Sequence, residues 1–379
     1  MAPLRVRYLS RALIAISFAI VVPPIVDSQP GPTRLRGVVD LTIGNVDETR
    51  DAYIFGGVSD LLLLDDGRIL VADNSTHDVR VFGSDGRHQF TIGRRGAGPG
   101  DLSRPCCLTI GPDGQLWIRD NGNHRYSIFE IGPREAKFLR TFRAHVSSPQ
   151  SFSSRVAWDS RGRVVHLGQI DDAHQRAFID ANGNVARWDT LRDPPSERLS
   201  VMRVQRRDQG TVATSWYYQP HGAFALRAYG PRGESAEAVS SSYSISWFDA
   251  ERNRIVLIRR PVVGPELSNR ERRAATAELD EIAKGARVTR ASLAFGVPRR
   301  KAPLRDLGFD LDGRLWVERT VPDGQPREAD IYDRRGTLLA VMTWPAHIRL
   351  NNRMVRGQTA IGVAVDSLGT NTVVRLRFR

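Results

Sequence analysis

VSDLLLLDDGRILVADNSTHDVRVFGSDGRHQFTIG, residues Val58 to Gly93, shares its plan with the next stretch, GRRGAGPGDLSRPCCLTIGPDGQLWIRDNGNHRYSIFE, residues Gly93 to Glu130. Each copy has an apolar run, an Asp-Gly turn, a second apolar run that ends in Asp-Asn, a third run, another turn and a fourth run. Four short strands in a unit of roughly 45 residues are typical of one β-propeller blade. The sequence therefore predicts an all-β propeller.

The repeat continues along the chain with less regularity. A third unit begins at Arg155, and a weaker fourth unit spans about Ser200 to Val239. Two more strands are predicted in Ser242 to Arg260, and the pattern resumes at PLRDLGFDLDGRLWVERT, from Pro303. We predict six blades, with seven as the alternative if Ser242 to Arg260 begins a blade of its own.

The two ends of the predicted propeller complement each other. The last stretch, Met354 to Phe378, supplies only two or three strands, while Arg36 to Gly44 forms a strand with no blade of its own. Pairing these segments would close the ring and remove its free edges.

One helix is predicted within the propeller, at about residues 265–285. Ser268 followed by Glu271 forms a capping box, and Gly285 is a suitable C-cap. Such a helix could serve as a lid over the propeller mouth or cover exposed strand edges. Its thin apolar stripe favours the second role.

The N-terminus has the layout of a secretory signal peptide. Basic residues (Arg5, Arg7 and Arg11) precede the apolar run 12–22, and a small-residue site follows at Ser28. The run is too short to span a bilayer, which needs about 20 residues. We therefore predict a signal peptide at residues 1–28, a single propeller domain at 29–379, export to the periplasm or medium, and no stable membrane span after cleavage.

The charge of the chain is strongly basic, with a formal net charge of +13. Only Lys137, Lys284 and Lys301 of its 55 basic residues are lysine, and the arginines are scattered rather than clustered with aromatic residues. This distribution argues against a nucleic-acid partner. We expect a monomer that binds a protein, a peptide or a cell-envelope glycan.

Blade topology predicts which side chains meet. Loops after the second and fourth strands of the blades share one face, the upper face, and turns after the first and third strands share the lower face. The candidate ligand-binding residues of the upper face are Asp73, Asn74, Arg94, Arg95, Asp120, Asn121, Glu318 and Arg319. This mixed rim would suit anionic or polyhydroxylated ligands. Alternatively, Asp and Asn after a strand bond to their own turn.

The two cysteines of the chain, Cys106 and Cys107, are adjacent. One interpretation is a pair of thiols on opposite faces of an inner strand. The other is a vicinal disulfide, which needs a distorted backbone because neighbouring Cα atoms lie about 3.8 Å apart.

The run GAGPGDLSRPCCLTIGPDGQLWIRDNGNHRYSIFE resembles an NHL-type repeat, with its Gly-rich loop, Pro, strand, Asp-Gly turn and Asp-Asn pair in order. With the signal peptide, the inserted helix and the closing strands, the chain resembles the secreted bacterial six-bladed propeller family. The resemblance implies the fold but no general catalytic mechanism. Cys106-Cys107 departs from the small or apolar pair usual there.

The function predicted from these features is that of an exported binding or scaffold module with no cofactor and no metal. The alternative is a metal-dependent hydrolase or lyase, because propeller lactonases resemble this fold and hold a cation in the channel. Its Ca²⁺ ligands would be Asp73, Asp120, Asn121 and Glu318. The histidines form no HExxH pair, and no G-x-S-x-G elbow occurs. Trp117 and Trp316, at matching positions of their blades, are predicted to pack between blades.

Overall fold

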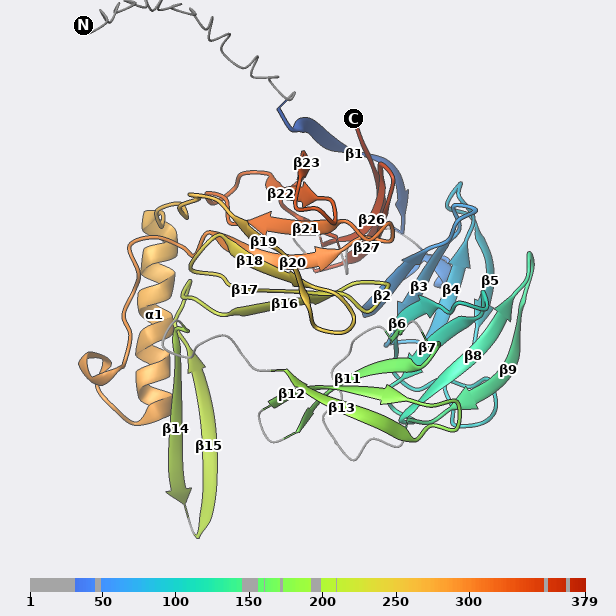
Figure 1. Ribbon diagram of the computed structural model, residues 1–379, viewed down its shortest axis with the longest axis horizontal. Helices are drawn as coiled ribbons and strands as arrows, with labels where there is room; N and C mark the ends of the chain where they lie inside the picture. Colours follow the sequence, from blue (N-terminus) through green and yellow to red (C-terminus); the bar gives the residue numbers. More distant parts are fainter. Residues whose placement is uncertain are drawn as a thin grey trace, which may run out of the picture. The chain divides into compact units, whose positions relative to one another are not determined.

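Five units of four short antiparallel strands follow one another along the chain (Figure 1). We call them blades I to V. Their strands are, in order, β2 (Val58–Leu63), β3 (Ile69–Asp73), β4 (Asp78–Phe82), β5 (His88–Ile92); β6 (Pro105–Ile110), β7 (Leu116–Asp120), β8 (Arg125–Ile131), β9 (Ala136–Phe142); β10 (Ala157–Trp158), β11 (Val164–Ile170), β12 (Ala173–Ile179), β13 (Val185–Leu191); β16 (Ala225–Tyr229), β17 (Ser235–Val239), β18 (Ser244–Phe248), β19 (Arg254–Arg259); and β20 (Leu304–Phe309), β21 (Leu315–Arg319), β22 (Arg327–Tyr332), β23 (Leu338–Trp344).

The computed structural model describes residues 31–44, 49–144, 156–159, 161–170, 173–191, 199–208, 210–350, 354–365 and 369–379. The predicted signal peptide, 1–28, lies outside the described residues. Residues from Pro32 to Arg379 form one compact unit.

A sixth blade joins the two ends of the chain. Its strands are β24 (Ile348–Arg349), β25 (Val355–Arg356), β26 (Thr359–Val365), β27 (Asn371–Phe378) and, outermost, β1 (Thr33–Ile43). β1 pairs antiparallel with β27, from Gly37 opposite Phe378 to Ile43 opposite Val373. The predicted closure of the ring is thereby confirmed.

The blade count is six, because Ser242 to Arg260 completes blade IV as β18 and β19. The predicted fourth unit, Ser200 to Val239, is corrected: its first half forms a separate two-stranded sheet of β14 (Val201–Asp208) and β15 (Thr211–Tyr218). Burial decides the assignment. Ile245 and Trp247 of blade IV are fully buried, whereas the described side chains of β14 and β15 are half-buried or exposed.

Apolar side chains pack between neighbouring blades. Trp117 of blade II meets Trp158 of blade III with ring centroids 5.4 Å apart, and Trp316 of blade V lies 5.9 Å from Phe378 of blade VI. The predicted inter-blade role of Trp117 and Trp316 is confirmed. Between blades III and IV a polar contact is described, in which buried Arg176 donates to the carbonyl of Ala250 at 3.0 Å.

The predicted helix is α1 (Asn269–Ala286), and it begins as expected. Ser268 Oγ accepts from the Glu271 amide at 3.2 Å, and Glu271 Oε2 accepts from the Ser268 amide at 2.9 Å. The predicted C-cap is corrected. Gly285 lies inside the helix, and Arg287, in the left-handed conformation (φ 58°), ends it by donating to the carbonyls of its last turn.

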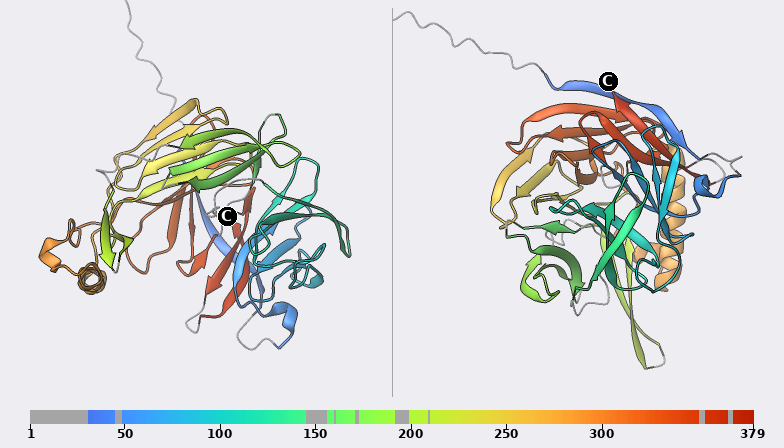
Figure 2. Two further views of the ribbon diagram at one scale, coloured as in Figure 1. Left: turned by 90° about the horizontal axis from the view of Figure 1, so that it is seen from below. Right: turned by 90° about the vertical axis from the view of Figure 1, so that its right-hand side faces the viewer.

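Helix α1 lies beside the β14–β15 hairpin (Figures 1 and 2). Arg206 of β14 donates to the carbonyl of Gly285 at 2.7 Å, and the phenol of Tyr217 lies next to the same glycine. The helix contacts this hairpin near its C-terminal end and the loop between β21 and β22 near its start, where Arg270 pairs with Asp323. It contributes no side chain to the central cavity described below, so it is not a lid over that space.

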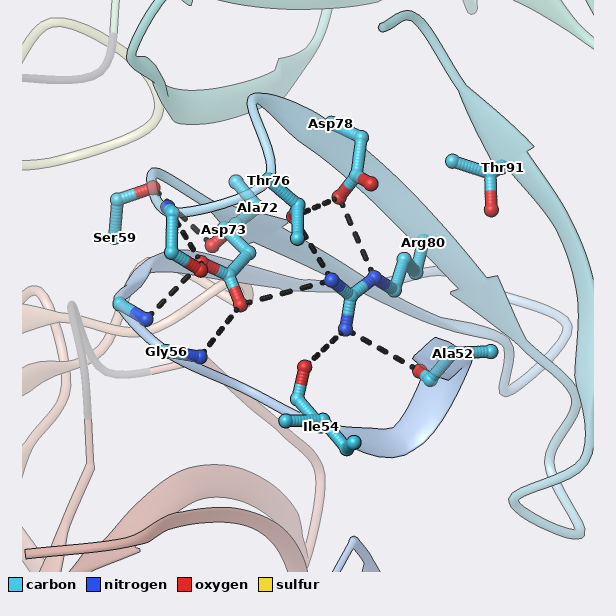
Figure 3. Close-up of polar contacts among 12 residues, drawn as sticks. Ala52, Ile54, Gly56, Ser59, Ala72, Asp73, Thr76, Asp78, Arg80 and Thr91 are labelled. Carbon is cyan, nitrogen blue, oxygen red and sulfur yellow. Dashed lines mark hydrogen bonds and ion pairs between the residues drawn. The ribbon is translucent and has the colours of Figure 1, made fainter. Parts of the chain in front are cut away.

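A buried aspartate and arginine fasten the segment that leads into blade I (Figure 3). Asp73, fully buried, accepts from the amides of Gly56 and Gly57 at 3.1 and 3.0 Å. Arg80, 3% exposed, donates to the carbonyl of Ile54 at 2.6 Å and lies 3.9 Å from Asp73. The carboxylate thus binds the N–H groups and the guanidinium a C=O group of one loop. We call such a pair an Asp–Arg latch.

Blade II has a second Asp–Arg latch. Asp120 accepts from the Ser103 amide at 2.7 Å, and Arg125 Nε lies 3.3 Å from Asp120 Oδ2. Arg125 also donates to the carbonyls of Ala97, at 3.0 Å, and Gly98, at 2.8 Å. Both latches tie an entering loop to the second and third strands of a blade, so they fix the position of each loop against its sheet.

Asp73→Asn should lower the free energy of unfolding by about 2 kcal/mol or more, because the amides of Gly56 and Gly57 would lose a charged acceptor and Arg80 would lose one of its two carboxylate neighbours. Urea unfolding followed by circular dichroism measures the change. The control is Asp85→Asn, whose exposed pair with Arg87 (3.6 Å) should be worth less than about 1 kcal/mol. Equal losses in the two variants would contradict the latch.

Ser268→Ala should destabilise α1 by about 1 kcal/mol, because the Glu271 amide loses its acceptor. Hydrogen exchange monitored by mass spectrometry should then show α1 exchanging about fivefold faster. Ser268→Asp, which retains a capping oxygen, should exchange like the wild type, and an unchanged rate in Ser268→Ala would contradict the role of the cap.

Candidate functional site: the central channel

A cavity of about 1460 Å³ lies at the centre of the ring of blades. All six blades contribute to its wall. One apolar representative from each blade is Leu64, Ile110, Trp158, Tyr229, Leu307 and Leu350. The cavity is larger than the pockets of roughly 300–1,000 Å³ that usually hold small ligands. It has room for a segment of a larger molecule.

The wall of the cavity belongs mainly to first strands and the lower-face turns. The turn residues include Asp66 and Arg68 of blade I, Pro112 of blade II and Arg232 of blade IV. At blade V the wall continues upwards along β20 and β21. The described cavity therefore extends from the lower face into the ring, away from the upper-face loops that the sequence singled out.

Glu318 and two arginines form the polar wall at blade V. Glu318 is 1% exposed, and its Oε1 atom lies 3.3 Å from Arg305 Nε and 3.2 Å from Arg327 Nη1. One carboxylate thereby orients two guanidinium groups. The Arg305 side chain is half exposed, so part of its donor capacity faces the cavity.

The rest of the lining is also mixed in charge. Among the described residues of the lining, arginine and carboxylate side chains occur in nearly equal numbers, and there is no lysine or histidine. Several pairs neutralise one another, as Arg68 and Asp66 do at 2.7 Å. A wall with alternating donors and acceptors suits a ligand rich in hydroxyl, amide or paired charged groups.

Asp73 and Asp120 do not reach a rim. The prediction placed them on the upper face, but both carboxylates are fully buried and bind backbone amides in the Asp–Arg latches. The sequence also offered an alternative, in which the aspartate bonds to its own turn. This alternative describes part of the role of Asp73, which also accepts from the amide of Ser75 at 2.8 Å.

The other candidates are dispersed. Asn74, Arg94 and Arg95 are exposed, and Arg94 pairs with Asp101 at 3.0 Å. Arg319 pairs with Glu328 and lies 3.4 Å from Asp330. None of these residues lines the central cavity, and Glu318 is the one member of the candidate set that does.

The four proposed Ca²⁺ ligands do not fit a common site. Ca²⁺ takes six to eight oxygen ligands. Both oxygens of Asp73 and of Asp120 already accept hydrogen bonds, Asn121 accepts from Arg119, and Glu318 is flanked by two arginines. Within the described ranges, no group of three or more His, Cys, Asp or Glu side chains is arranged to hold a metal ion.

Cys106 and Cys107 are joined by a disulfide in the structure. Strand alternation would place the two sulfurs on opposite faces, but the pairing of β6 with β7 shifts between Cys106 and Thr109, and Cys107 is left-handed (φ 58°). The irregular backbone brings both sulfurs to one side. Both residues are at most 5% exposed, and Asn121 Nδ2 lies 3.3 Å from Cys106 Sγ.

His166 lies in the core of the propeller. It is 3% exposed between blades II and III, with Nδ1 2.7 Å from the Tyr126 hydroxyl. Burial, with a smaller contribution from the charge of Arg119, lowers the pKa of His166 to about 3. The residue is a neutral part of the inter-blade core and does not line the cavity.

Arg305 and Arg327 were missed by the sequence analysis. Arg305 is the second residue of its inner strand, and Arg327 lies diagonally across from Glu318, because Glu318 pairs with Ala329. A diagonal contact between adjacent strands needs the register, which the sequence alone did not supply. The one available signal was the alternation of charge in Pro303 to Thr320.

The sequence matches the model of a family described as 6-bladed beta-propeller over residues 47–124. A comparison with curated proteins returns no match. Among solved structures, a Bacteroides fragilis protein whose name marks it as a candidate for export is 10% identical, with 91% of this chain and 99% of that chain covered and a TM-score of 0.49.

Two further solved structures are similar. Virginiamycin B lyase from Staphylococcus aureus is 11% identical, with 85% and 94% of the two chains covered and a TM-score of 0.42. The calcium-binding protein regucalcin from Agrobacterium tumefaciens is 9% identical, with 92% and 97% covered and a TM-score of 0.41. All three scores are below 0.5, so no activity is carried over. The family description, matched over residues 47–124, agrees with the strand order of the structure: the chain folds as a six-bladed β-propeller.

Proposed function

We propose that this chain is an exported binding module whose central channel holds a segment of a peptide or of a cell-envelope glycan. The observation that carries the proposal is the wall of the channel, which combines a volume of about 1460 Å³ with arginine and carboxylate side chains held in place by ion pairs. Such preorganised donors and acceptors lower the entropy cost of binding a polar ligand.

Arg305 is the residue best placed to contact the ligand. Its guanidinium is oriented by buried Glu318 and is still half exposed. Arg349 of β24 is exposed and lines the same cavity. Arg305 and Arg327 both lie against the single buried carboxylate of Glu318. This part of the wall is therefore suited to a ligand with a carboxylate, a phosphate or a carbonyl group.

Export is part of the proposal and rests on the sequence. The basic residues, the apolar run 12–22 and the small-residue site at Ser28 support a cleaved signal peptide. Within the part of the chain that the structure describes, no helix is long and apolar enough to cross a membrane.

The binding role needs no metal in this proposal, because the oxygen donors weighed as Ca²⁺ ligands are engaged elsewhere. Elemental analysis of the purified, dialysed protein by inductively coupled plasma mass spectrometry should therefore find no stoichiometric Ca²⁺ or Zn²⁺. Addition of a chelator should leave the melting temperature unchanged. One tightly held ion per chain would contradict the proposal and favour the hydrolase or lyase alternative.

Labelled protein applied to peptide and oligosaccharide arrays should bind a set of polar ligands. Arg305→Gln should weaken that binding by about tenfold or more, because a charge-assisted hydrogen bond contributes roughly 1.5–3 kcal/mol. Arg87→Gln is the matched control, since Arg87 is 88% exposed and lies outside the channel. Binding to neither array, or equal affinities of the two variants, would contradict the channel as the ligand site.

A further inference from the structure

The β14–β15 hairpin has two unlike faces. Val201 pairs with Tyr218, Arg203 with Trp216 and Arg207 with Val212, so these side chains share one face. We call it the outer face; its residues are Val201, Arg203, Gln205, Arg207, Val212, Thr214, Trp216 and Tyr218. The opposite face carries Arg206 and Tyr217, which contact α1. The helix therefore covers one face of the hairpin and leaves the outer face open.

Large apolar side chains are exposed on the outer face. The exposed fractions are 55% for Val212, 45% for Trp216 and 60% for Tyr218. The guanidinium of Arg203 lies over the Trp216 ring, 5.1 Å from its centroid. A two-stranded hairpin is only marginally stable by itself. A contiguous group of exposed apolar side chains on such an element is typical of an interaction surface.

The charge of the outer face has one sign. Arg203 and Arg207 are exposed, and by the strand register no Asp or Glu belongs to the set of eight residues. None of the eight lines either of the two described cavities. Small ligands prefer concave sites, so a projecting hairpin suits an extended surface instead. The two exposed arginines indicate that this surface is negatively charged.

We propose that the outer face docks the protein onto an anionic lipid bilayer. Trp and Tyr are the side chains that favour the boundary between lipid and water, and arginines beside them pair with anionic headgroups. Among the described residues, β14 and β15 pair only with each other, so no further strand covers their outer edges. Backbone N–H and C=O groups at the edge of a sheet need polar surroundings, and the hairpin therefore rests at the depth of the headgroups.

The docking is peripheral and independent of the channel. The hairpin is inserted between blades III and IV, and its outer face contributes nothing to the channel wall. Loss of one role leaves the other intact, so the two proposals are separable by experiment.

The test is co-sedimentation with vesicles of phosphatidylcholine, with and without phosphatidylglycerol. The protein is recovered after export, and its N-terminus is established by mass spectrometry. We expect binding to the anionic vesicles that weakens with salt. Arg203→Gln with Arg207→Gln should weaken it by about thirtyfold, since each arginine near the surface contributes about 1 kcal/mol.

The matched control is Arg254→Gln with Arg259→Gln, which removes the same charge from two exposed arginines of β19. It should lose only the small share of affinity that depends on total charge. Trp216→Ser with Tyr218→Ser should also weaken binding, whereas Ile255→Ser, at an exposed apolar position of β19, should not. Circular dichroism establishes that each variant is folded.

Three outcomes would overturn the proposal. The first is equal affinity for vesicles with and without phosphatidylglycerol. The second is equal loss in the hairpin and β19 arginine variants, which would indicate a general charge effect. The third is binding of polygalacturonate or an acidic protein through Arg203 and Arg207 without binding of anionic vesicles, which would assign the outer face to a different partner.

Discussion

Main-chain pairing between the two ends of the chain fixes the geometry of the ring. β1 first runs parallel to β23, with Arg36 opposite Thr343, and then crosses to β27, with Gly37 opposite Phe378. A Cβ atom at Gly37 would lie 3.1 Å from the side chains of both Leu376 and Phe378, so a larger residue at the crossing would require these neighbours to shift by a few tenths of an ångström. This strand joins the outer edges of blades V and VI, which also pack through Trp316 and Phe378, and the channel wall depends on their spacing.

The positions of the loops between blades are a second constraint on the fold, and the buried charges of the Asp–Arg latches fix two of these loops. Buried charges are costly unless each has a partner and hydrogen bonds. Asp73 and Asp120 meet this condition by binding loop amides, while Arg80 and Arg125 bind loop carbonyls. The charges that look most like ligand-binding groups in the sequence are therefore part of the fold. The channel receives its charge from other positions, most of them in blades IV and V.

The fold was largely predictable from the sequence because each blade repeats the same alternation and the same turns. The capping box at Ser268 likewise gave the start of α1. The hairpin was not predictable: Val201–Tyr218 alternates like a blade pair, and only burial separates the two. The end of α1 was missed because Arg287 is an ordinary residue in a left-handed conformation. In the site, Glu318 was singled out from its place near the end of a strand, whereas Arg305 and Arg327 depend on the register between strands.

The second residue of the innermost strand shows how one repeated position can carry different chemistry. Val58, Pro105 and Leu304 each pair with the last residue of their second strand, and the residues that follow them are Ser59, Cys106 and Arg305. Ser59 donates to the carbonyl of Pro105 in the next blade at 2.6 Å, Cys106 is bridged to Cys107, and Arg305 meets Glu318 in the channel. Positions that every blade needs for packing cannot vary in this way. At this repeated position the side chain differs from blade to blade, and in blade V it is the arginine that lines the cavity.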